Sequence, residues 1–133
     1  SRGMFVTMLI GLYDENTKEL ILANAGHEPP IILNDKDEFS NFNEAGPPLG
    51  IVKKTQYQEY KIKFEKSSMY IFTDGITEIK NPQGEELGSI GFQNYIKKYK
   101  DKPNNERLQS IIENVLNSKY SQKDDLTIVV LDS

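Results

Sequence analysis

The sequence predicts an α+β fold in which antiparallel strands come first, helices follow, and one strand returns at the end. Three observations support this prediction. Short apolar segments rich in β-branched and aromatic residues alternate with turn residues in the first half of the chain. A helical amphipathic pattern appears in the second half. A last apolar run, residues 126–131, comes after it. This order is typical of sheets that helices cover on at least one face.

The composition is that of one globular domain. The chain has 133 residues, of which 37% are hydrophobic, and a net charge of −4. The acidic balance argues against a nucleic-acid surface, and the lysines among residues 97–102 are expected to lie on a solvated helix face and loop. No segment is apolar enough to span a membrane and no signal peptide is visible, so no direct membrane contact is expected. The absence of cysteine fits a reducing, cytoplasmic compartment.

Five segments are expected to be strands before the helices begin. Residues 4–13 and 18–25 flank a polar turn, which predicts a hairpin. Residues 31–33 form a short strand, and residues 57–64 alternate between apolar and charged side chains as a half-buried antiparallel strand does. Residues 67–73 are rich in large apolar side chains and are expected to be the central strand.

Two helices are expected before the last strand. Residues 92–99 form a short one. Asn104 or Asn105 can supply the N-cap of the next, which is expected to end near Lys119. Its apolar side chains recur at spacings of three and four, which indicates one buried face. These residues are Leu108, Ile111, Ile112, Val115 and Leu116.

The central strand ends abruptly in Thr73-Asp74-Gly75. A carboxylate at the end of a buried strand costs free energy unless another group binds it. Asp74 could cap the turn that follows, or it could bind a hard cation. If residues 75–78 form a helical turn, Asp74 and Glu78 face the same side and repel each other without a cation. Oxygen donors of this kind suit magnesium or manganese better than zinc.

A second acidic site precedes the last strand, at Asp124 and Asp125. Adjacent residues of an extended segment point in opposite directions, so only one of them can easily face a site shared with Asp74. The alternative is a solvated acidic loop. His27 is the only histidine. It could be packed in a turn, or it could serve as a general acid, a phosphate contact or a metal ligand.

Five short motifs, in order, resemble the stage II sporulation protein E (SpoIIE) family of serine/threonine phosphatases, which belongs to the metal-dependent PPM superfamily. The resemblance spans nearly the whole chain. It implies an α-β-β-α sandwich of two antiparallel sheets flanked by helices. The motifs are Met4-Phe5-Val6-Thr7 with Gly11, Ala23-Asn24-Ala25-Gly26-His27 with Pro29-Pro30, Gly46-Pro47-Pro48-Leu49-Gly50, Phe72-Thr73-Asp74-Gly75-Ile76-Thr77-Glu78, and Asp124-Asp125-Leu126-Thr127.

The resemblance also implies an activity. Members of the family bind two manganese or magnesium ions between the sheets, and a metal-activated water attacks phosphoserine or phosphothreonine. Their usual substrates are phosphorylated STAS-domain anti-sigma-factor antagonists in bacteria. Asp74 and Asp124 match metal-ligating aspartates, and Glu78 matches a position that serves a weaker third metal. The residues expected beside the metals or the substrate are Asp125, Gly75 and His27.

Two motifs of the family are missing from the chain: a Gly-Asp-(Phe/Tyr) strand and an Asp-Val-x-Gly-His-Gly turn, which complete the metal centre. Residues 1–133 are therefore expected to be the C-terminal part of a single SpoIIE-type phosphatase domain, without its first strands and first helix. The chain alone is expected to bind metal weakly and to have little or no turnover. A degenerate, non-catalytic regulatory or interaction module of the same fold is the alternative. A homodimer through exposed strand edges is also expected.

Overall fold

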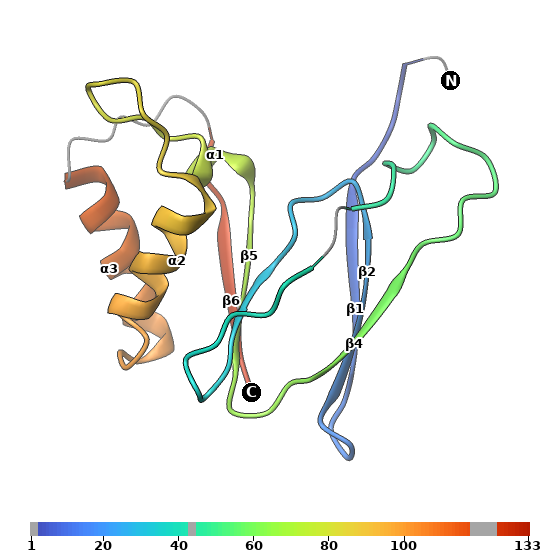
Figure 1. Cartoon of the computed structure of the whole chain (residues 1–133), viewed down its shortest axis with the longest axis horizontal. Coiled ribbons are helices and arrows are strands. Elements are labelled where there is room, and N and C mark those ends of the chain that lie inside the picture. Colours follow the sequence, from blue (N-terminus) through green and yellow to red (C-terminus); the bar gives the residue numbers. More distant parts are fainter. Residues whose placement is uncertain (1–2, 43–44, 118–124) are drawn as a thin grey trace. The chain divides into compact units, whose positions relative to one another are not determined.

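The computed structural model describes residues 3–42, 45–117 and 125–133. The chain divides into two compact units, one of residues 1–68 with Ser133 and one of residues 69–132 (Figure 1). The described strands belong to two three-stranded sheets, one of β1, β2 and β4 and the other of β3, β5 and β6. Antiparallel sheets accompanied by helices confirm the predicted α+β class. No helix in the described part of the chain is both long and apolar enough to span a membrane.

The first unit is built on an antiparallel sheet. β1 (Met8–Asp14) and β2 (Glu19–Ala25) form the predicted hairpin, and β4 (Glu59–Lys63) pairs with the other edge of β2. The Asp14 carboxylate closes the hairpin turn because it accepts a 2.8 Å hydrogen bond from the backbone N–H of Asn16. β3 (Ile31–Leu33) is short and fully buried.

One face of this sheet is the core side. Leu20 and Leu22 on β2 are buried, and their cross-strand partners on β4 are Ile62 and Tyr60. The charged residues of β4 are exposed, so its alternation is as predicted. β1 begins at Met8, later than the expected residue 4, because Val6 is bridged to Leu49 by two backbone hydrogen bonds of 3.0 and 2.7 Å. The sequence pattern does not distinguish such a bridge from a strand.

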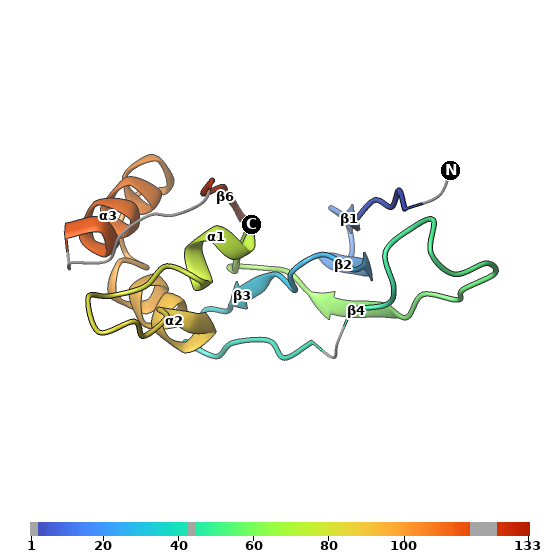
Figure 2. The same cartoon turned by 90° about the horizontal axis from the view of Figure 1, so that it is seen from above.

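The second unit packs three helices against β5 (Ser68–Phe72) and β6 (Ile128–Asp132). The helices are α1 (Asp74–Thr77), α2 (Gly88–Lys98) and α3 (Asn104–Asn117). α1 packs against α2, and α3 packs against β6 (Figure 1, Figure 2). Phe92 on α2 is fully buried, and the rings of Tyr70 and Phe72 meet it edge-on at centroid distances of 6.3 and 5.1 Å.

The starts of the two longer helices differ from the predictions. α2 begins at Gly88, a residue with φ of 70°, rather than at residue 92. α3 begins at Asn104, so Asn104 and Asn105 lie inside the helix and the predicted cap is wrong. The carbonyl of Pro103 accepts the backbone N–H groups of Glu106 and Arg107, at 3.0 Å each. A proline at this boundary leaves no orphan N–H of its own.

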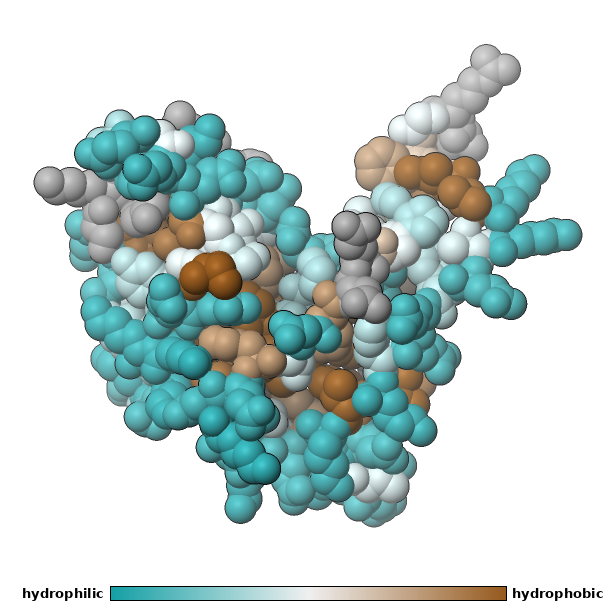
Figure 3. All heavy atoms as spheres, in the orientation of Figure 1, coloured by the Kyte–Doolittle hydropathy of each residue, from teal (hydrophilic) through white to brown (hydrophobic). Residues whose placement is uncertain are grey.

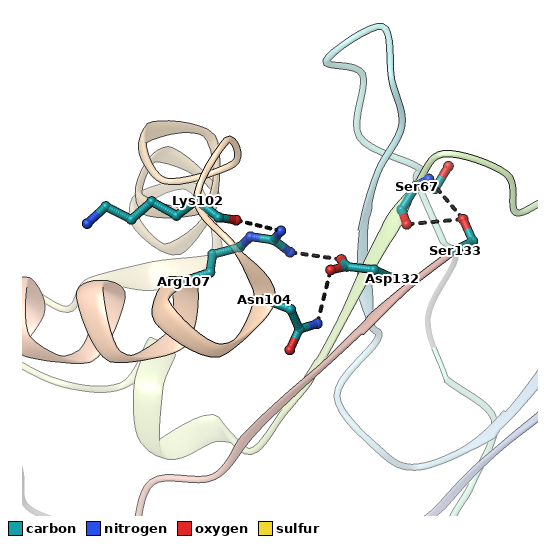
Figure 4. A network of polar contacts seen from close by, with 6 residues as sticks. All are labelled: Ser67, Lys102, Asn104, Arg107, Asp132 and Ser133. Atoms are coloured by element: carbon teal, nitrogen blue, oxygen red, sulfur yellow. Dashed lines mark hydrogen bonds and ion pairs between the residues drawn. The ribbon is translucent and has the colours of Figure 1, made fainter.

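The buried stripe of α3 consists of Arg107, Ile111 and Val115. Arg107 lies only 6% exposed, and its guanidinium donates hydrogen bonds of 2.8 Å to the Asp132 carboxylate and 2.9 Å to the Lys102 carbonyl (Figure 4). Burial lowers the pKa of Arg107, but its hydrogen bonds to Asp132 and Tyr70 outweigh this effect and leave that pKa above its ordinary value. The arginine is therefore charged inside the unit, with Nη1 and Nη2 hydrogen-bonded and the buried Nε without a hydrogen bond to any described residue.

The pairing of β5 with β6 is antiparallel and continues past both strands. At one end, the Thr73 N–H donates to the Thr127 carbonyl at 3.1 Å, and the Thr127 N–H donates to Thr73 Oγ1 at 3.2 Å. At the other end, the Ser133 N–H donates to the Ser67 carbonyl at 3.0 Å. The same register places Asp125 opposite Gly75, where an added Cβ would collide with the Asp125 carbonyl oxygen. Only glycine allows this close approach.

Replacing Gly75 by alanine is expected to destabilise the protein by about 2–3 kcal/mol, because the new methyl group collides with a backbone carbonyl. Helix propensity alone predicts the opposite sign, a gain of up to about 1 kcal/mol. Urea unfolding of wild type and Gly75→Ala measures the difference. Gly84→Ala is the control, since Gly84 has φ of 81° and no atom within 4 Å of an added Cβ, and it should lose only about 1 kcal/mol. Equal or higher stability of Gly75→Ala would contradict the close approach.

Stability is expected to fall above pH 10 because of Tyr70. Burial raises the pKa of its hydroxyl above the ordinary value of 10.0, although Arg107 lowers it. The unfolded chain therefore loses this proton at lower pH than the folded chain does, and the stabilisation is complete below pH 10.0 and is lost as the pH rises through the folded-state pKa. Urea unfolding at about pH 8 and about pH 11 tests this. At the lower pH, Tyr70→Phe should be less stable than wild type by about 1 kcal/mol. Its stability should fall less than that of wild type between the two pH values. An equal fall in both proteins would exclude Tyr70 as the cause.

Candidate functional site

Asp74 and Glu78 stand one helical turn apart at the end of the central strand. α1 is a helical turn with Asp74 as its first residue and Glu78 at its C-cap, so the condition for the two carboxylates to share a side is met. Both side chains are exposed. The spacing of four puts the two carboxylates on the same side of the turn. The structure thus provides two oxygen-donor groups that a ligand can reach from solvent.

Asp74 does not cap this turn. The cap position belongs to Thr73, whose side chain makes no capping hydrogen bond. Its Oγ1 instead accepts the N–H of Thr127. The hydroxyl of Thr77 and the backbone N–H of Glu78 both donate to the carbonyl of Asp74, at 3.2 and 2.9 Å. The fold therefore fixes Asp74 through its backbone, and its carboxylate is not used for capping.

The second acidic segment reaches the same turn. Asp125 is exposed, and its carbonyl group lies directly over Gly75. The predicted meeting of the two strand ends is thus present for Asp125. Asp124, the residue expected to bind metal, lies outside the described residues. In the sequence it directly precedes Asp125.

The donor chemistry of these residues fits a magnesium or manganese ion, because carboxylate oxygens are the ligands that such hard cations prefer. Residues 3–42, 45–117 and 125–133 contain no group of three or more histidine, aspartate or glutamate side chains placed to hold one ion. Asp74, Glu78 and Asp125 therefore do not form a complete ion site among themselves.

His27 lies in a turn of the first unit, as the structural alternative predicted. Its backbone N–H donates to Asn24 Oδ1 at 2.9 Å, and its carbonyl accepts from Asn24 Nδ2 at 2.8 Å. Ring atom Nδ1 lies 2.8 Å from the Glu28 carbonyl. A carbonyl only accepts hydrogen bonds, so Nδ1 carries a proton and the neutral ring has its lone pair on Nε2. The ring is half-buried, and its Nε2 can accept a hydrogen bond from a ligand.

The first three motifs of the sequence come together in the first unit. The Gly46 N–H donates to the Asn24 carbonyl at 3.1 Å, and Leu49 is bridged to Val6. A side chain on Gly26, which has φ of 74°, would overlap Pro48. The glycines and prolines of these motifs are thus explained by backbone conformation and close packing. No catalytic role is required to account for them.

Sequence reasoning missed the residues that hold the site in place. Thr73 and Thr127 belong to the sequence motifs without a predicted role of their own, yet they link the two acidic segments by hydrogen bonds. Arg107 was not identified, although its spacing of four from Ile111 continues the apolar stripe of α3. A charged residue at an apolar position of a helical pattern was the signal that could have revealed it.

Comparison with known proteins identifies the relatives of the chain. The family model described as Stage II sporulation protein E (SpoIIE) matches residues 1–133. The phosphoserine phosphatase RsbU of Bacillus subtilis is 30% identical over 132 residues, which are 97% of this chain and 39% of RsbU. Protein IcfG of Synechocystis is 33% identical over 87 residues, 65% of this chain and 14% of that protein. The chain thus spans well under half the length of these relatives.

Solved structures share the fold. The SiaA-PP2C domain of Pseudomonas aeruginosa superimposes with a TM-score of 0.78 at 18% identity, over 96% of this chain and 51% of that one. The phosphatase domain of Bacillus subtilis SpoIIE, presoaked with manganese, gives a TM-score of 0.69 at 20% identity, over 95% of this chain and 55% of that one. The match of the family model to the full length and the identity to RsbU together establish that the chain belongs to the SpoIIE family.

Proposed function

We propose that this chain is the C-terminal part of a single SpoIIE-type phosphatase domain whose parent removes phosphate from phosphoserine or phosphothreonine of a regulatory protein. One observation supports this best. The Asp125 carbonyl lies over Gly75, so the turn that contains Asp74 and the segment that follows Asp124 are neighbours although they are far apart in sequence. Two of the five family motifs thereby meet at one exposed place.

The proposed roles follow from the positions of the residues. Manganese or magnesium, when bound, activates water and neutralises phosphoryl oxygens. Asp74 and Asp124 would hold the two catalytic ions, and Glu78 would help to hold a weaker third one. Asp125, whose carbonyl lies over Gly75, would act beside the metals or the substrate. His27 would be a substrate contact whose Nε2 accepts a hydrogen bond or a proton.

The proposed substrate is a phosphorylated STAS-domain protein of a bacterial partner-switching pathway that regulates a sigma factor, in the cytoplasm. The relative RsbU is a phosphoserine phosphatase, which supports the substrate class. The composition without cysteine is consistent with a reducing compartment. The alternative is a degenerate, non-catalytic regulatory or interaction module of the same fold. The acidic residues retained at the site favour the phosphatase.

Removing the Asp74 carboxylate is expected to weaken the binding of manganese by about tenfold or more, because a two- or three-carboxylate site loses one of its charges. Isothermal titration of this chain with Mn²⁺ should give weak binding for the wild type and no measurable binding for Asp74→Asn. Asp101→Asn, at an exposed position of the same unit, is the matched control and should bind as the wild type does. Equal binding by all three proteins would contradict the metal assignment.

The same proteins test the expected low turnover. Hydrolysis of p-nitrophenyl phosphate by the chain alone should stay near background, since two or three carboxylates hold these ions weakly. Robust hydrolysis that disappears in Asp74→Asn would contradict the proposed inactivity and would support the phosphatase assignment. Manganese binding without hydrolysis is the expected pattern.

The sheet edge at β1 supports self-association. Among the described strands, β1 pairs with β2 on one side only. Met8, Ile10 and Leu12 on one face of β1 are 46%, 54% and 67% exposed. Figure 3 shows hydrophobic surface in the first unit close to the start of the chain. An open groove of about 720 Å³ continues this surface. Its lining residues are Gly3, Met4, Phe5, Val6, Met8, Leu49 and Gly50. We propose a homodimer in which two β1 edges pair, because no lysine or proline protects this strand.

A lysine on β1 is expected to disrupt the dimer. Ile10→Lys places a charge on the pairing strand and should raise the dimer dissociation constant by about tenfold or more. Sedimentation velocity over a range of concentrations measures it. Ile90→Lys is the control, since Ile90 is 70% exposed on α2 and should leave the dimer unchanged. A wild-type chain that remains monomeric at the highest concentration would contradict the proposal.

A further inference from the structure

The end of β6 that lies away from the acidic turn is locked to α3. Asp132 is the last residue of β6, and its carboxylate accepts hydrogen bonds from Arg107 at 2.8 Å and from Asn104 at 3.0 Å. Figure 4 shows both α3 side chains pointing to this carboxylate. The next residue, Ser133, is bonded to Ser67 through its backbone and its Oγ. β6 is therefore held from two directions at this end.

The hydrogen-bonded ion pair of Arg107 with Asp132, called the lock below, is specific because Arg107 is buried. The Arg107 side chain is 8% exposed and that of Asp132 is 33% exposed. Arg107 also donates to the Lys102 carbonyl and hydrogen-bonds to the Tyr70 hydroxyl on β5. The arginine thus contacts both paired strands and its own helix start. A buried guanidinium that loses its carboxylate is strongly destabilised, so a displaced β6 is penalised.

The consequence of the lock appears at the opposite end of the strand pair. Side chains alternate along a strand, and a slip by one residue moves each of them to the other face. A slip of β6 would take the Asp125 carbonyl away from Gly75 and break both hydrogen bonds between Thr73 and Thr127. It would also turn the Asp125 side chain to the other face of the strand pair. The register therefore determines how the segment of Asp125 lies against the turn of Asp74.

We propose that Arg107 and Asp132 are positioning residues of the candidate metal site, which act by fixing the register of β6 against β5. Neither residue touches the acidic turn. The strand pair transmits their effect, because its hydrogen bonds run from Ser67 and Ser133 at one end to Thr73 and Thr127 at the other. The effect on metal binding rests on the function proposed above, whereas the effect on register does not.

The test compares two variants that remove the ion pair of Arg107 with Asp132 and one variant that only lowers the stability of the second unit. Asp132→Asn removes the charge of the acceptor. The double variant Arg107→Met with Asp132→Leu replaces the ion pair by apolar groups, a change that is often neutral for stability. Ile96→Val is the control, since Ile96 is fully buried on α2 and lies outside the lock. Amide hydrogen exchange at Thr127 and the ¹⁵N–¹H shift of Gly75 report the register, and titration with Mn²⁺ reports the site.

Both lock variants are expected to speed exchange at Thr127 at least tenfold beyond the change in global stability, to shift the Gly75 resonance, and to weaken Mn²⁺ binding about tenfold. Ile96→Val should do none of these after correction for stability. Unchanged Thr127 exchange and Gly75 shift in the stable double variant would overturn the proposal, as would equal changes in Ile96→Val. If the register signals change while wild type binds no Mn²⁺, the lock stands and the metal assignment fails.

Discussion

The antiparallel pairing of β5 with β6 is the interaction on which the candidate site depends. Its hydrogen bonds join segments 54 residues apart in sequence at Thr73 and Thr127. The same register brings the Asp125 carbonyl onto Gly75. Each hydrogen bond of a strand pair contributes only a modest net free energy. Together, however, these bonds define the position of one strand relative to the other to within a fraction of a residue. That accuracy is what an oxygen-donor site needs, because ligand distances vary little.

The pairing requires support on its helical side. Phe92 covers Tyr70 and Phe72, and Ile111 and Val115 of α3 are fully buried. Apolar packing of this kind supplies stability but little directional information. The ion pair between Arg107 and Asp132 is directional. The second unit thus combines an apolar core that stabilises it with one polar network that specifies where β6 lies.

Much of the fold could be predicted from the sequence, because hydrophobic periodicity and turn residues report local structure directly. The hairpin of β1 and β2 and the alternation of β4 are confirmed. Helix starts were less predictable. Asn104 is a good cap by type, yet its side chain bonds to Asp132. That partner is distant in sequence, and no local pattern reveals it.

The site was predictable only in part for the same reason. The acidic residues stood out because carboxylates next to apolar strands are unusual. Their mutual placement depends on register, which a single sequence does not state. The family resemblance gave the correct family, and the full-length match of the SpoIIE family model confirms it. The individual metal ligands remain predictions, and Asp124 lies outside the described residues.

The separation of Thr73 from Thr127 has a consequence for folding order. α2 and α3 lie between β5 and β6 in the sequence. The ribosome therefore synthesises the residues of α1, α2 and α3 before those of β6. Closing such a long loop is entropically costly and slow compared with forming a helix. Until β6 docks, α1 is a turn of four residues, too short to persist alone. The two acidic segments of the candidate site therefore come together only when β6 docks, which is one of the last steps of folding.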